Sequence, residues 1–294
     1  MGAKGGALVE RAVQILTKRG HHVTVLPTTG PGTACGIARQ RIAAGADLVV
    51  AAGGDGTINE VAEGMVTSGV PLAILPAGTA NVLATEMKLA PHVERAAESL
   101  DDWRPRRISV GHATCDGGRV ARHFLLMAGI GLDAHIVYHV SGPLKARAGK
   151  LAYWVAAGGV LGRALPQLQA ETDGQRHECS FALVTKVRNY GGDFEIAREV
   201  GLFDDQFEVV LFEGRSSLRY VKYFTGMVLH RLSGMEGVTV LRASRVALSS
   251  TSGQRVHVQI DGEYAGPLPA EIRIVPGALT LLVPSAYRPP EPAL

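Results

Sequence analysis

The sequence predicts an α/β N-terminal domain with a Rossmann-like parallel sheet, followed by a C-terminal, mostly antiparallel β-sandwich domain. Helical stretches alternate with short apolar strands in the first part of the chain, which is the rhythm of an α/β domain. From about Ile108 onward, short alternating strands replace this rhythm. With 294 residues, 46% hydrophobic and 19% charged, the chain is long enough to form two separate cores.

The N-terminal elements alternate between helix and strand. The first two helical patterns end at Gly20 and Gly45, as helices commonly do. Helices are expected over residues 8–19, 33–44 and 57–66, and strands over residues 22–26, 46–52 and 70–75. The almost uncharged segment 46–52 suits a strand that is buried on both faces of a parallel sheet.

The C-terminal elements are short strands of alternating polarity. They are expected over residues 124–128, 180–186, 207–212, 246–249, 256–260 and 279–283. The segment 103–107, which contains Pro105, is the candidate boundary between the domains. We therefore expect an α/β domain over residues 1–105, a β-sandwich domain over residues 106–284 and a proline-rich tail over residues 285–294.

A glycine-rich turn after the segment 46–52 is the candidate anion-binding site. Gly53, Gly54 and Gly56 allow a tight turn in which successive N–H groups converge on an anion at the start of a helix. Asp55 lies inside this turn, where a carboxylate would repel a phosphate unless a divalent cation lay between them. We therefore expect Asp55 to bind Mg²⁺. The alternative is that Asp55 is only a turn or capping residue.

Two further features accompany this turn. Thr57 and Glu60 are spaced as a capping box, and both are also included among the candidate cofactor-binding residues. A second glycine turn, PAGTAN, follows the next predicted strand and opens another helix. Ligands of open parallel sheets gather at the carboxyl ends of the strands, so residues 53–57 and 78–81 should form two lips of one crevice.

The segment VQIDGEYAG contains a second pair of candidate acids, Asp261 and Glu263. Period-two geometry would place both carboxylates on one side of a strand. As hairpin chemistry the pair needs no function, because Asp-Gly is a common turn signal. Beside a nucleotide site, however, the two are suitable as the acids that phosphoryl transfer to a hydroxyl group requires.

Net charge, cysteine spacing and hydropathy indicate the binding partners and the cellular compartment to expect. The net charge of +3 is too weak to indicate nucleic-acid binding and is compatible with contact to an anionic membrane. The three cysteines suggest neither a disulfide framework nor a zinc site, so a reducing cytoplasm is expected. No signal peptide or membrane-spanning stretch is predicted. The segment 144–165 predicts a core helix, with a membrane-surface helix as the alternative.

The segments GGDGTINEV, PAGTAN and IDGE together resemble the catalytic family of diacylglycerol and sphingosine kinases, specifically its soluble bacterial lipid kinases. The segments MAGIGLDAHIV, RNYGGDFEIA and PGALTLLVP extend the resemblance over nearly the whole chain. It implies an ATP- and Mg²⁺-dependent kinase that acts on a lipid hydroxyl, with diacylglycerol as the first substrate to test. It also implies a cytoplasmic enzyme with peripheral membrane contact. The oligomeric state is left open, with a homodimer as one candidate.

The resemblance also implies roles for the candidate residues. ATP phosphates and Mg²⁺ would be bound by Gly53, Gly54, Asp55, Gly56 and Thr57, and the nucleotide pocket would be completed by Gly78, Thr79 and Asn81. Asp261 and Glu263 would be the catalytic base and its acidic partner, in either order. ATP and the lipid hydroxyl would meet in the cleft between the two domains.

Three departures from the family pattern qualify these expectations. Family members usually begin with a β-strand and an Asn-Pro, whereas this chain starts at GAKGG, so the first strand is expected to be missing. Val82 follows Asn81 where an Asp is often found, and FDDQFEV replaces a common Asp-Gly pair, which leaves Asp204 as a candidate for a structural metal site. The alternative functions are an NAD kinase and a non-catalytic lipid- or nucleotide-binding protein.

Overall fold

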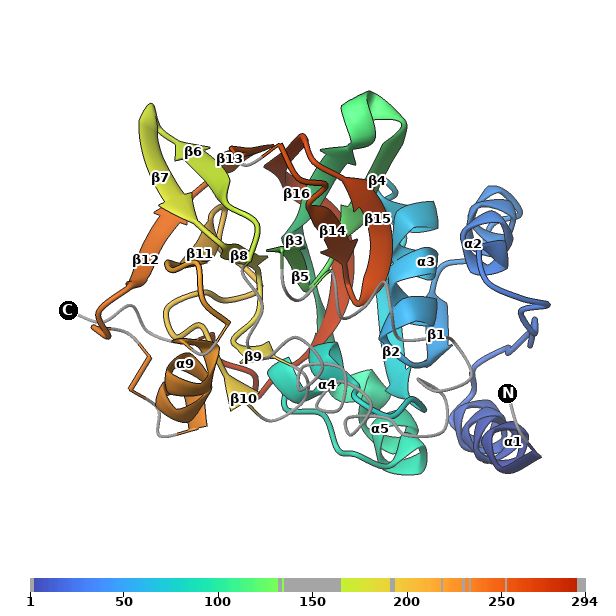
Figure 1. Ribbon diagram of the computed structural model, residues 1–294. Coiled ribbons are helices and arrows are strands. Elements are labelled where there is room, and N and C mark those ends of the chain that lie inside the picture. The colour runs from blue at the N-terminus through green and yellow to red at the C-terminus, as the bar shows by residue number, and fades with distance from the viewer. Residues whose placement is uncertain are drawn as a thin grey trace. The chain divides into compact units, whose positions relative to one another are not determined.

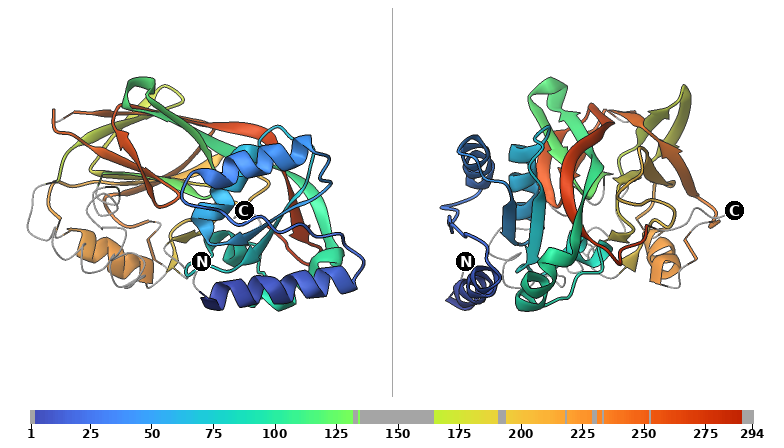
Figure 2. Two further views of the ribbon diagram at one scale, coloured as in Figure 1. Left: turned by 90° about the vertical axis from the view of Figure 1, so that its right-hand side faces the viewer. Right: turned by 180° about the vertical axis from the view of Figure 1, so that it is seen from behind.

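The computed structural model describes residues 3–131, 134, 165–190, 194–217, 219–228, 231–232, 234–251 and 253–289 (Figures 1 and 2). Its contacts divide the chain into two compact units. The first contains the chain up to Ser109 together with Pro276–Pro289, and the second contains Val110–Val275. The chain passes from the first unit to the second within β3 (Trp103–Cys115) and returns within β16 (Ala270–Pro284).

The first unit is an α/β layer. Its elements are α1 (Ala3–Lys18), α2 (Thr33–Ala43), β1 (Val49–Gly53), α3 (Asp55–Met65), β2 (Leu72–Pro76), α4 (Val82–Glu86), α5 (Val93–Ser99) and the 3-10 turn η1 (Leu100–Asp102). Strands β1 and β2 are parallel, with Gly53 opposite Pro76, and Leu281 of β16 pairs in parallel with Leu72. The carboxyl ends of β1 and β2 therefore lie side by side.

Helices cover the strands of this first unit. Helix α1 contacts α5, and together with β2 they bury a cluster that includes Leu16, Leu75, Ala97 and Trp103. Helix α3 contacts both strands, and α2 lies against α3 (Figure 1). The buried residues of α3 are not part of the α1–α5 cluster, as expected for a helix on the other face of the strands.

One predicted strand of the first unit is not formed. Residues 21–29 carry no regular secondary structure, so the predicted strand over residues 22–26 is wrong. Val23 packs against the α1–α5 cluster, whereas Val25 and Leu26 are exposed by 52% and 40%. The alternating pattern alone does not make a strand, because a strand also needs a neighbour for its backbone hydrogen bonds.

The second unit is an antiparallel β-sandwich. One sheet has the order β12 (Val238–Ala243), β11 (Phe207–Phe212), β8 (Phe181–Thr185), β5 (Met127–Gly131), β14 (His257–Ile260), β15 (Glu263–Pro267). In the other, the first part of β16 pairs with β13 (Arg245–Ser250), followed by β6 (Leu168–Thr172) and β7 (Gln175–Cys179). Strand β3 pairs with β4 (Val120–Phe124). The remaining elements are the 3-10 turn η2 (Asp116–Gly118), the short strands β9 (Asn189–Tyr190) and β10 (Phe194–Glu195), and α9 (Arg219–Val228).

Side chains from both sheets form one core in the second unit. Phe124 of β4 stacks on Phe207 of β11, with the ring centroids 5.7 Å apart. Gly111 of β3 lies under the Phe124 ring, so closely that a Cβ atom at this position would be 2.1 Å from the ring. Val246 and Ile272 from one sheet and Val184 and Val258 from the other belong to the same buried cluster. The predicted fold class, an α/β domain followed by a β-sandwich domain, is confirmed.

The closing strand differs from its expected place. The segment 279–283 was expected in the second domain, but it belongs to β16 and groups with the first unit. Strand β16 is long enough for its first part to pair with β13 while Leu281 pairs with β2. The predicted strand 124–128 is interrupted, because β4 ends at Phe124 and β5 begins at Met127.

The predicted helix 144–165 lies outside the described residues except for its last position, and the tail beyond residue 289 lies outside them entirely. Within the described part of the chain, no helix is long and apolar enough to cross a membrane.

Candidate active site

The two glycine turns of the first unit contact each other. They follow β1 and β2, and the N–H of Ala77 donates a hydrogen bond to the carbonyl oxygen of Gly53 (3.0 Å). A Cβ atom placed on Gly78 would lie 2.3 Å from the Cα atom of Gly54. Only glycine fits at this backbone contact, so the sequence keeps both turns free of side chains where they meet.

Asp55 connects the first turn to the second. It is the first residue of α3, after the extended Gly54, and its Oδ1 accepts a hydrogen bond from the N–H of Leu83 at the start of α4 (3.3 Å). Partial burial raises the pKa of Asp55, while backbone N–H groups that include those of Val82 and Leu83 act in the opposite direction. The carboxylate thus carries a desolvation cost that a nearby cation would reduce.

Asn81 fixes the shape of the second turn. Its Oδ1 accepts the N–H of Gly78 and its Nδ2 donates to the carbonyl of Gly78, both at 2.9 Å. Its φ of 48° lies in the left-handed region, which Asn tolerates better than most residues. Gly78 and Thr79 are exposed at the tip of this turn. Two expectations are confirmed here: the turns are neighbours, and a helix begins directly after Asn81.

Glu60 has a different contact from the one predicted. Its Oε1 accepts the N–H of Gly32 (2.7 Å) and its Oε2 accepts the N–H of Ala34 (3.1 Å), at the start of α2. Helix α3 begins at Asp55, before Thr57, with Gly54 as its N-cap and no side-chain cap. The predicted capping box of Thr57 and Glu60 is therefore wrong, because the helix starts earlier and Glu60 caps a neighbouring helix instead.

In the second unit, Asp261 is the hydrogen-bond acceptor for a loop. It lies with Gly262 in the turn between β14 and β15, and both residues have positive φ, 48° and 79°. Its carboxylate accepts the N–H groups of Leu125 (3.0 Å), Leu126 (3.0 Å) and Met127 (2.8 Å). Desolvation raises the pKa of Asp261 to about 6, although these N–H groups and the nearby Arg122 lower it.

Glu263 has other surroundings. It is the first residue of β15, its side chain is 48% exposed, and its Oε2 pairs with the guanidinium of Arg122 (3.1 Å). The same guanidinium also donates to the carbonyl oxygens of Ile260 (3.0 Å) and Glu263 (3.2 Å). The expectation of one shared side of a strand does not apply, because Asp261 lies in the turn. The turn reading of Asp-Gly is correct, with both positive φ angles of a type I′ hairpin.

Sequence reasoning missed the partners of these acids. Arg122 occupies an alternating strand segment and has no motif that would set it apart. The N–H groups of residues 125–127 carry no side-chain signal, and the sequence predicts an uninterrupted strand over residues 124–128 where the structure has this loop. Backbone donors of this kind become visible only when the chain is folded.

Two family models match the chain and together cover most of it. The diacylglycerol kinase catalytic domain matches residues 2–113, and the YegS C-terminal NAD kinase beta sandwich-like domain matches residues 126–283. The match to a kinase catalytic domain makes the protein an enzyme of the phosphotransferase class. The chain belongs to the diacylglycerol kinase family of lipid kinases.

Named relatives agree with this membership, and a solved structure shares the fold. The chain is 27% identical over 267 residues to a diacylglycerol kinase of Bacillus subtilis (strain 168), covering 89% of this chain and 86% of the relative. It is 28% identical over 249 residues to one of Mycobacterium tuberculosis (strain ATCC 25618 / H37Rv), covering 83% and 79%. A crystal structure described as a diacylglycerol kinase from Bacillus anthracis str. Sterne shares the fold, with a TM-score of 0.77, 22% identity and coverage of 96% and 92%.

Proposed function

We propose that this protein is an ATP- and Mg²⁺-dependent kinase that converts diacylglycerol to phosphatidic acid. The observation that carries the proposal is the contact of the two glycine turns, linked by Asp55, in the part of the chain that matches the diacylglycerol kinase catalytic domain. Two similar relatives bear the name diacylglycerol kinase, which supports the choice of substrate.

In this proposal the first unit binds the nucleotide. The exposed turn 78–81 and the N-terminal end of α3 would hold the phosphate groups, because backbone N–H groups that converge in a turn or at the start of a helix attract anions. Gly53, Gly54, Gly56, Thr57, Thr79 and Asn81 would contribute as backbone or turn-shaping residues. Glu60 would act indirectly, since both of its carboxylate oxygens hold the start of α2.

Asp55 suits a Mg²⁺ ion that is shared with the nucleotide. Among the described residues, no group of three or more His, Cys, Asp or Glu could hold a metal ion by itself. Mg²⁺ is, however, commonly bound by one or two carboxylates together with substrate phosphates and water. The raised pKa of Asp55 indicates a carboxylate that gains from a nearby cation. Bound there, Mg²⁺ would neutralise phosphate charge during transfer.

The second unit would supply the general base that accepts the proton of the lipid hydroxyl. Within the described residues, the Asp261 carboxylate accepts hydrogen bonds from three backbone N–H groups, so we assign it the role of holding the hairpin and the loop 125–127 in place. Glu263 is half exposed and has one oxygen on Arg122, so we assign it the role of general base that accepts the hydroxyl proton. Arg122 would fix the orientation of that base.

The proposal includes a location. Diacylglycerol resides in membranes, so an enzyme that phosphorylates it has to reach a bilayer surface. The net charge of +3 is compatible with weak attraction to anionic lipids. We accordingly propose a cytoplasmic protein that visits the membrane peripherally.

The test is transfer of labelled γ-phosphate from Mg·ATP to diacylglycerol, sphingosine, ceramide and NAD. Asp55→Asn should lower transfer to the preferred lipid by about 10²-fold or more through lost electrostatic stabilisation. Glu263→Gln should lower it by about 10²-fold to 10⁴-fold through loss of the base. The exposed residues Asp47 and Glu178 supply matched controls, since Asp47→Asn and Glu178→Gln remove the same charge elsewhere.

The acceptor panel separates the candidate functions. The proposal is supported if the wild type phosphorylates diacylglycerol and both Asp55→Asn and Glu263→Gln lose this activity. Transfer to NAD alone would replace it by an NAD kinase, a function that the name of the second matching domain keeps open. ATP binding without transfer to any acceptor would favour a non-catalytic binding protein.

A further inference from the structure

Lys186 is a buried lysine held by carbonyl oxygens of a loop. It follows β8 directly and is 1% exposed. Its Nζ donates to the carbonyl oxygen of Asp204 and to that of Gly201, the latter at 3.5 Å. A lysine is rarely buried so fully unless its charge is compensated. Here the compensation comes from the backbone of the loop 196–206.

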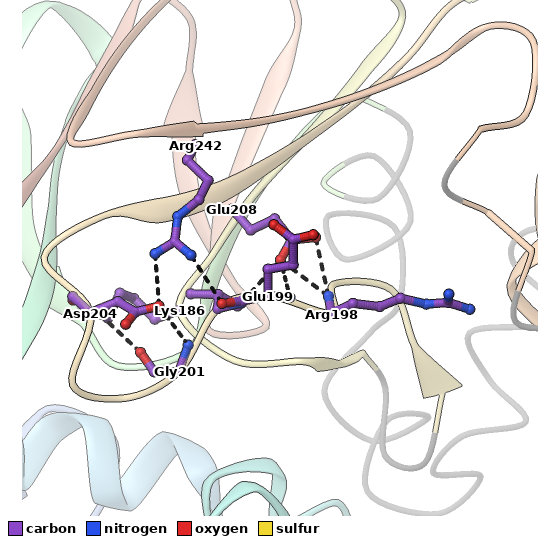
Figure 3. Close-up of polar contacts among 8 residues, drawn as sticks. Lys186, Arg198, Glu199, Gly201, Asp204, Glu208 and Arg242 are labelled. Carbon is purple, nitrogen blue, oxygen red and sulfur yellow. Dashed lines mark hydrogen bonds and ion pairs between the residues drawn. The ribbon is translucent and has the colours of Figure 1, made fainter. Parts of the chain in front are cut away.

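Other backbone N–H and carbonyl groups of this loop form hydrogen bonds with charged side chains, including those of Glu208 and Arg242 from neighbouring strands (Figure 3). The buried carboxylate of Glu208 accepts the N–H groups of Arg198, Glu199 and Val200. Figure 3 shows Asp204 between Gly201 and Arg242; its Oδ2 accepts the N–H of Gly201 (3.0 Å) and pairs with the Arg242 guanidinium (2.8 Å). The guanidinium also donates to the carbonyl oxygen of Glu199 (3.0 Å).

The carbonyl and carboxylate oxygen atoms of this loop would suit a hard metal ion if no cationic side chain already bound them. Backbone carbonyl and carboxylate oxygens are the ligands of Ca²⁺ and Mg²⁺, and Asp204 was the residue that the sequence suggested for a structural metal. In the structure, however, the Lys186 ammonium binds the two carbonyls and the Arg242 guanidinium binds the carboxylate. The residues present therefore do not fit a metal ion, because two cations of the chain already occupy its place.

The Lys186 backbone connects the loop to Asp261. The N–H of Lys186 donates to the carbonyl oxygen of Leu126 (2.8 Å), which also accepts the hydroxyl of Thr185 (3.3 Å). The N–H of Leu126 in turn donates to Oδ1 of Asp261 (3.0 Å). The carbonyl group of Leu126 is thus bound by Lys186, and its N–H group is bound by Asp261.

From this arrangement we propose that Lys186 is an internal cation in place of a metal ion and a positioning residue for Asp261. Its ammonium fixes the loop 196–206 and so anchors residue 186 itself, whose backbone N–H holds the loop 125–127 that donates to the Asp261 carboxylate. The first part depends only on the contacts of Lys186. The second part rests on the proposed function, because it assumes that the Asp261–Glu263 hairpin takes part in the reaction.

The cation part is tested by thermal unfolding of the full chain without nucleotide. Wild-type protein should melt at the same temperature in EDTA as in millimolar Mg²⁺ or Ca²⁺. Lys186→Met keeps the side-chain volume but removes the ammonium donor of the Asp204 carbonyl and leaves the Gly201 carbonyl with only the N–H of Asp204. It should therefore lower Tm by about 4–8 °C, and added metal should not restore it. The exposed Lys18 offers the control Lys18→Met, which should leave Tm unchanged.

Two results would overturn the cation part. One is a wild-type Tm that falls in EDTA and recovers with a divalent cation, because a metal ion would then bind in this loop. The other is a Lys186→Met protein as stable as wild type. If Lys186→Met cannot be obtained folded, Lys186→Gln retains a hydrogen-bond donor without the charge, and the same melting comparison applies to it.

The positioning part is tested by kinetics with diacylglycerol. Lys186→Gln should lower kcat by about tenfold and move the acidic limb of the pH–kcat profile, with KM for ATP unchanged. Gly64→Ala is the control for lost stability alone, because it crowds α2 against α3 in the first unit and should leave the shape of the profile unchanged. An unaltered profile in Lys186→Gln would overturn the positioning role. If wild type phosphorylates no acceptor, the proposed function fails, while the melting experiments still decide the cation part.

Discussion

Gly78 illustrates how a single residue determines the geometry of the nucleotide turns. In Gly78→Ala the new Cβ atom would lie 2.3 Å from the Gly54 Cα atom and 2.8 Å from Oδ1 of Asn81. Backbone cannot move away as easily as a side chain, so we expect the free energy of unfolding to fall by about 1–3 kcal/mol. Urea unfolding of the variant measures this change.

The control for this substitution is Gly69→Ala. A Cβ atom at Gly69 would meet nothing within 4 Å, so this variant should unfold like wild type. We also expect weaker ATP binding in Gly78→Ala only, measured by nucleotide-dependent protection from thermal unfolding. Equal stability of the two variants would mean that the turns can separate without cost, contrary to the close contact in the structure.

The cysteines give a second prediction for individual residues. Burial raises the pKa of Cys115 to about 11 and that of Cys179 to about 12, whereas Cys35 is partly exposed. Only the thiolate reacts with alkylating reagents, so the two buried thiols should be inert in the folded protein. Mass spectrometry after iodoacetamide treatment at pH 8 should find the label on Cys35 alone. Labelling in denaturant should reach all three; native labelling of Cys179 would contradict its burial.

Individual residues were predictable from the sequence where the backbone left little choice. The glycines around Asp55, and Asn81 at a left-handed position, are identities that tight turns demand. Arg122 and Lys186 were not predictable, because their partners are distant carboxylates and backbone carbonyls that nothing in the local pattern indicates. A buried lysine in the sequence looks like any other lysine until the loop around it is known.

At the scale of secondary-structure elements, Glu60 connects two helices. Glu60→Ala removes the acceptor of the Gly32 and Ala34 N–H groups at the start of α2, so it should lower the free energy of unfolding by about 0.5–2 kcal/mol. Thermal or urea unfolding measures the change. Thr57→Ala is the comparison, since a true capping box would make both substitutions costly. A loss of ATP affinity in Glu60→Ala without any loss of stability would instead support direct nucleotide binding.

The elements differ in how well the sequence predicted them. The predicted strands 46–52 and 70–75 correspond to β1 and β2, which begin two or three residues later than expected. Their apolar runs pair in register, and a glycine turn follows each strand. The segment 22–26 has an equally good alternating pattern but pairs with no strand of the described chain. Strand formation depends on a partner that local periodicity does not encode. For the same reason, the pattern of segment 279–283 gave its type but not its sheet.

For the molecule as a whole, the free energy of unfolding at alkaline pH depends on a buried lysine and two buried cysteines, whose titrations have opposite effects. Burial lowers the pKa of Lys186 to about 8, against an unfolded value of 10.5. Between these values the unfolded chain binds a proton that the folded chain has released, so this group makes folding more favourable as pH rises. Cys115 and Cys179 have raised pKa values, so above pH 9.0 they make folding less favourable.

Comparison of wild type with Lys186→Met isolates the lysine, because both proteins contain the same thiols. The difference in the free energy of unfolding should shift in favour of wild type by about 3 kcal/mol as pH rises through the interval from about 8 to 10.5. Desolvation causes the low pKa, with Arg242 acting in the same direction and Asp204 and Asp205 against it. Urea unfolding at several pH values measures the difference. If it stays constant across this interval, the lysine keeps its proton in the folded protein and the loop compensates the charge fully.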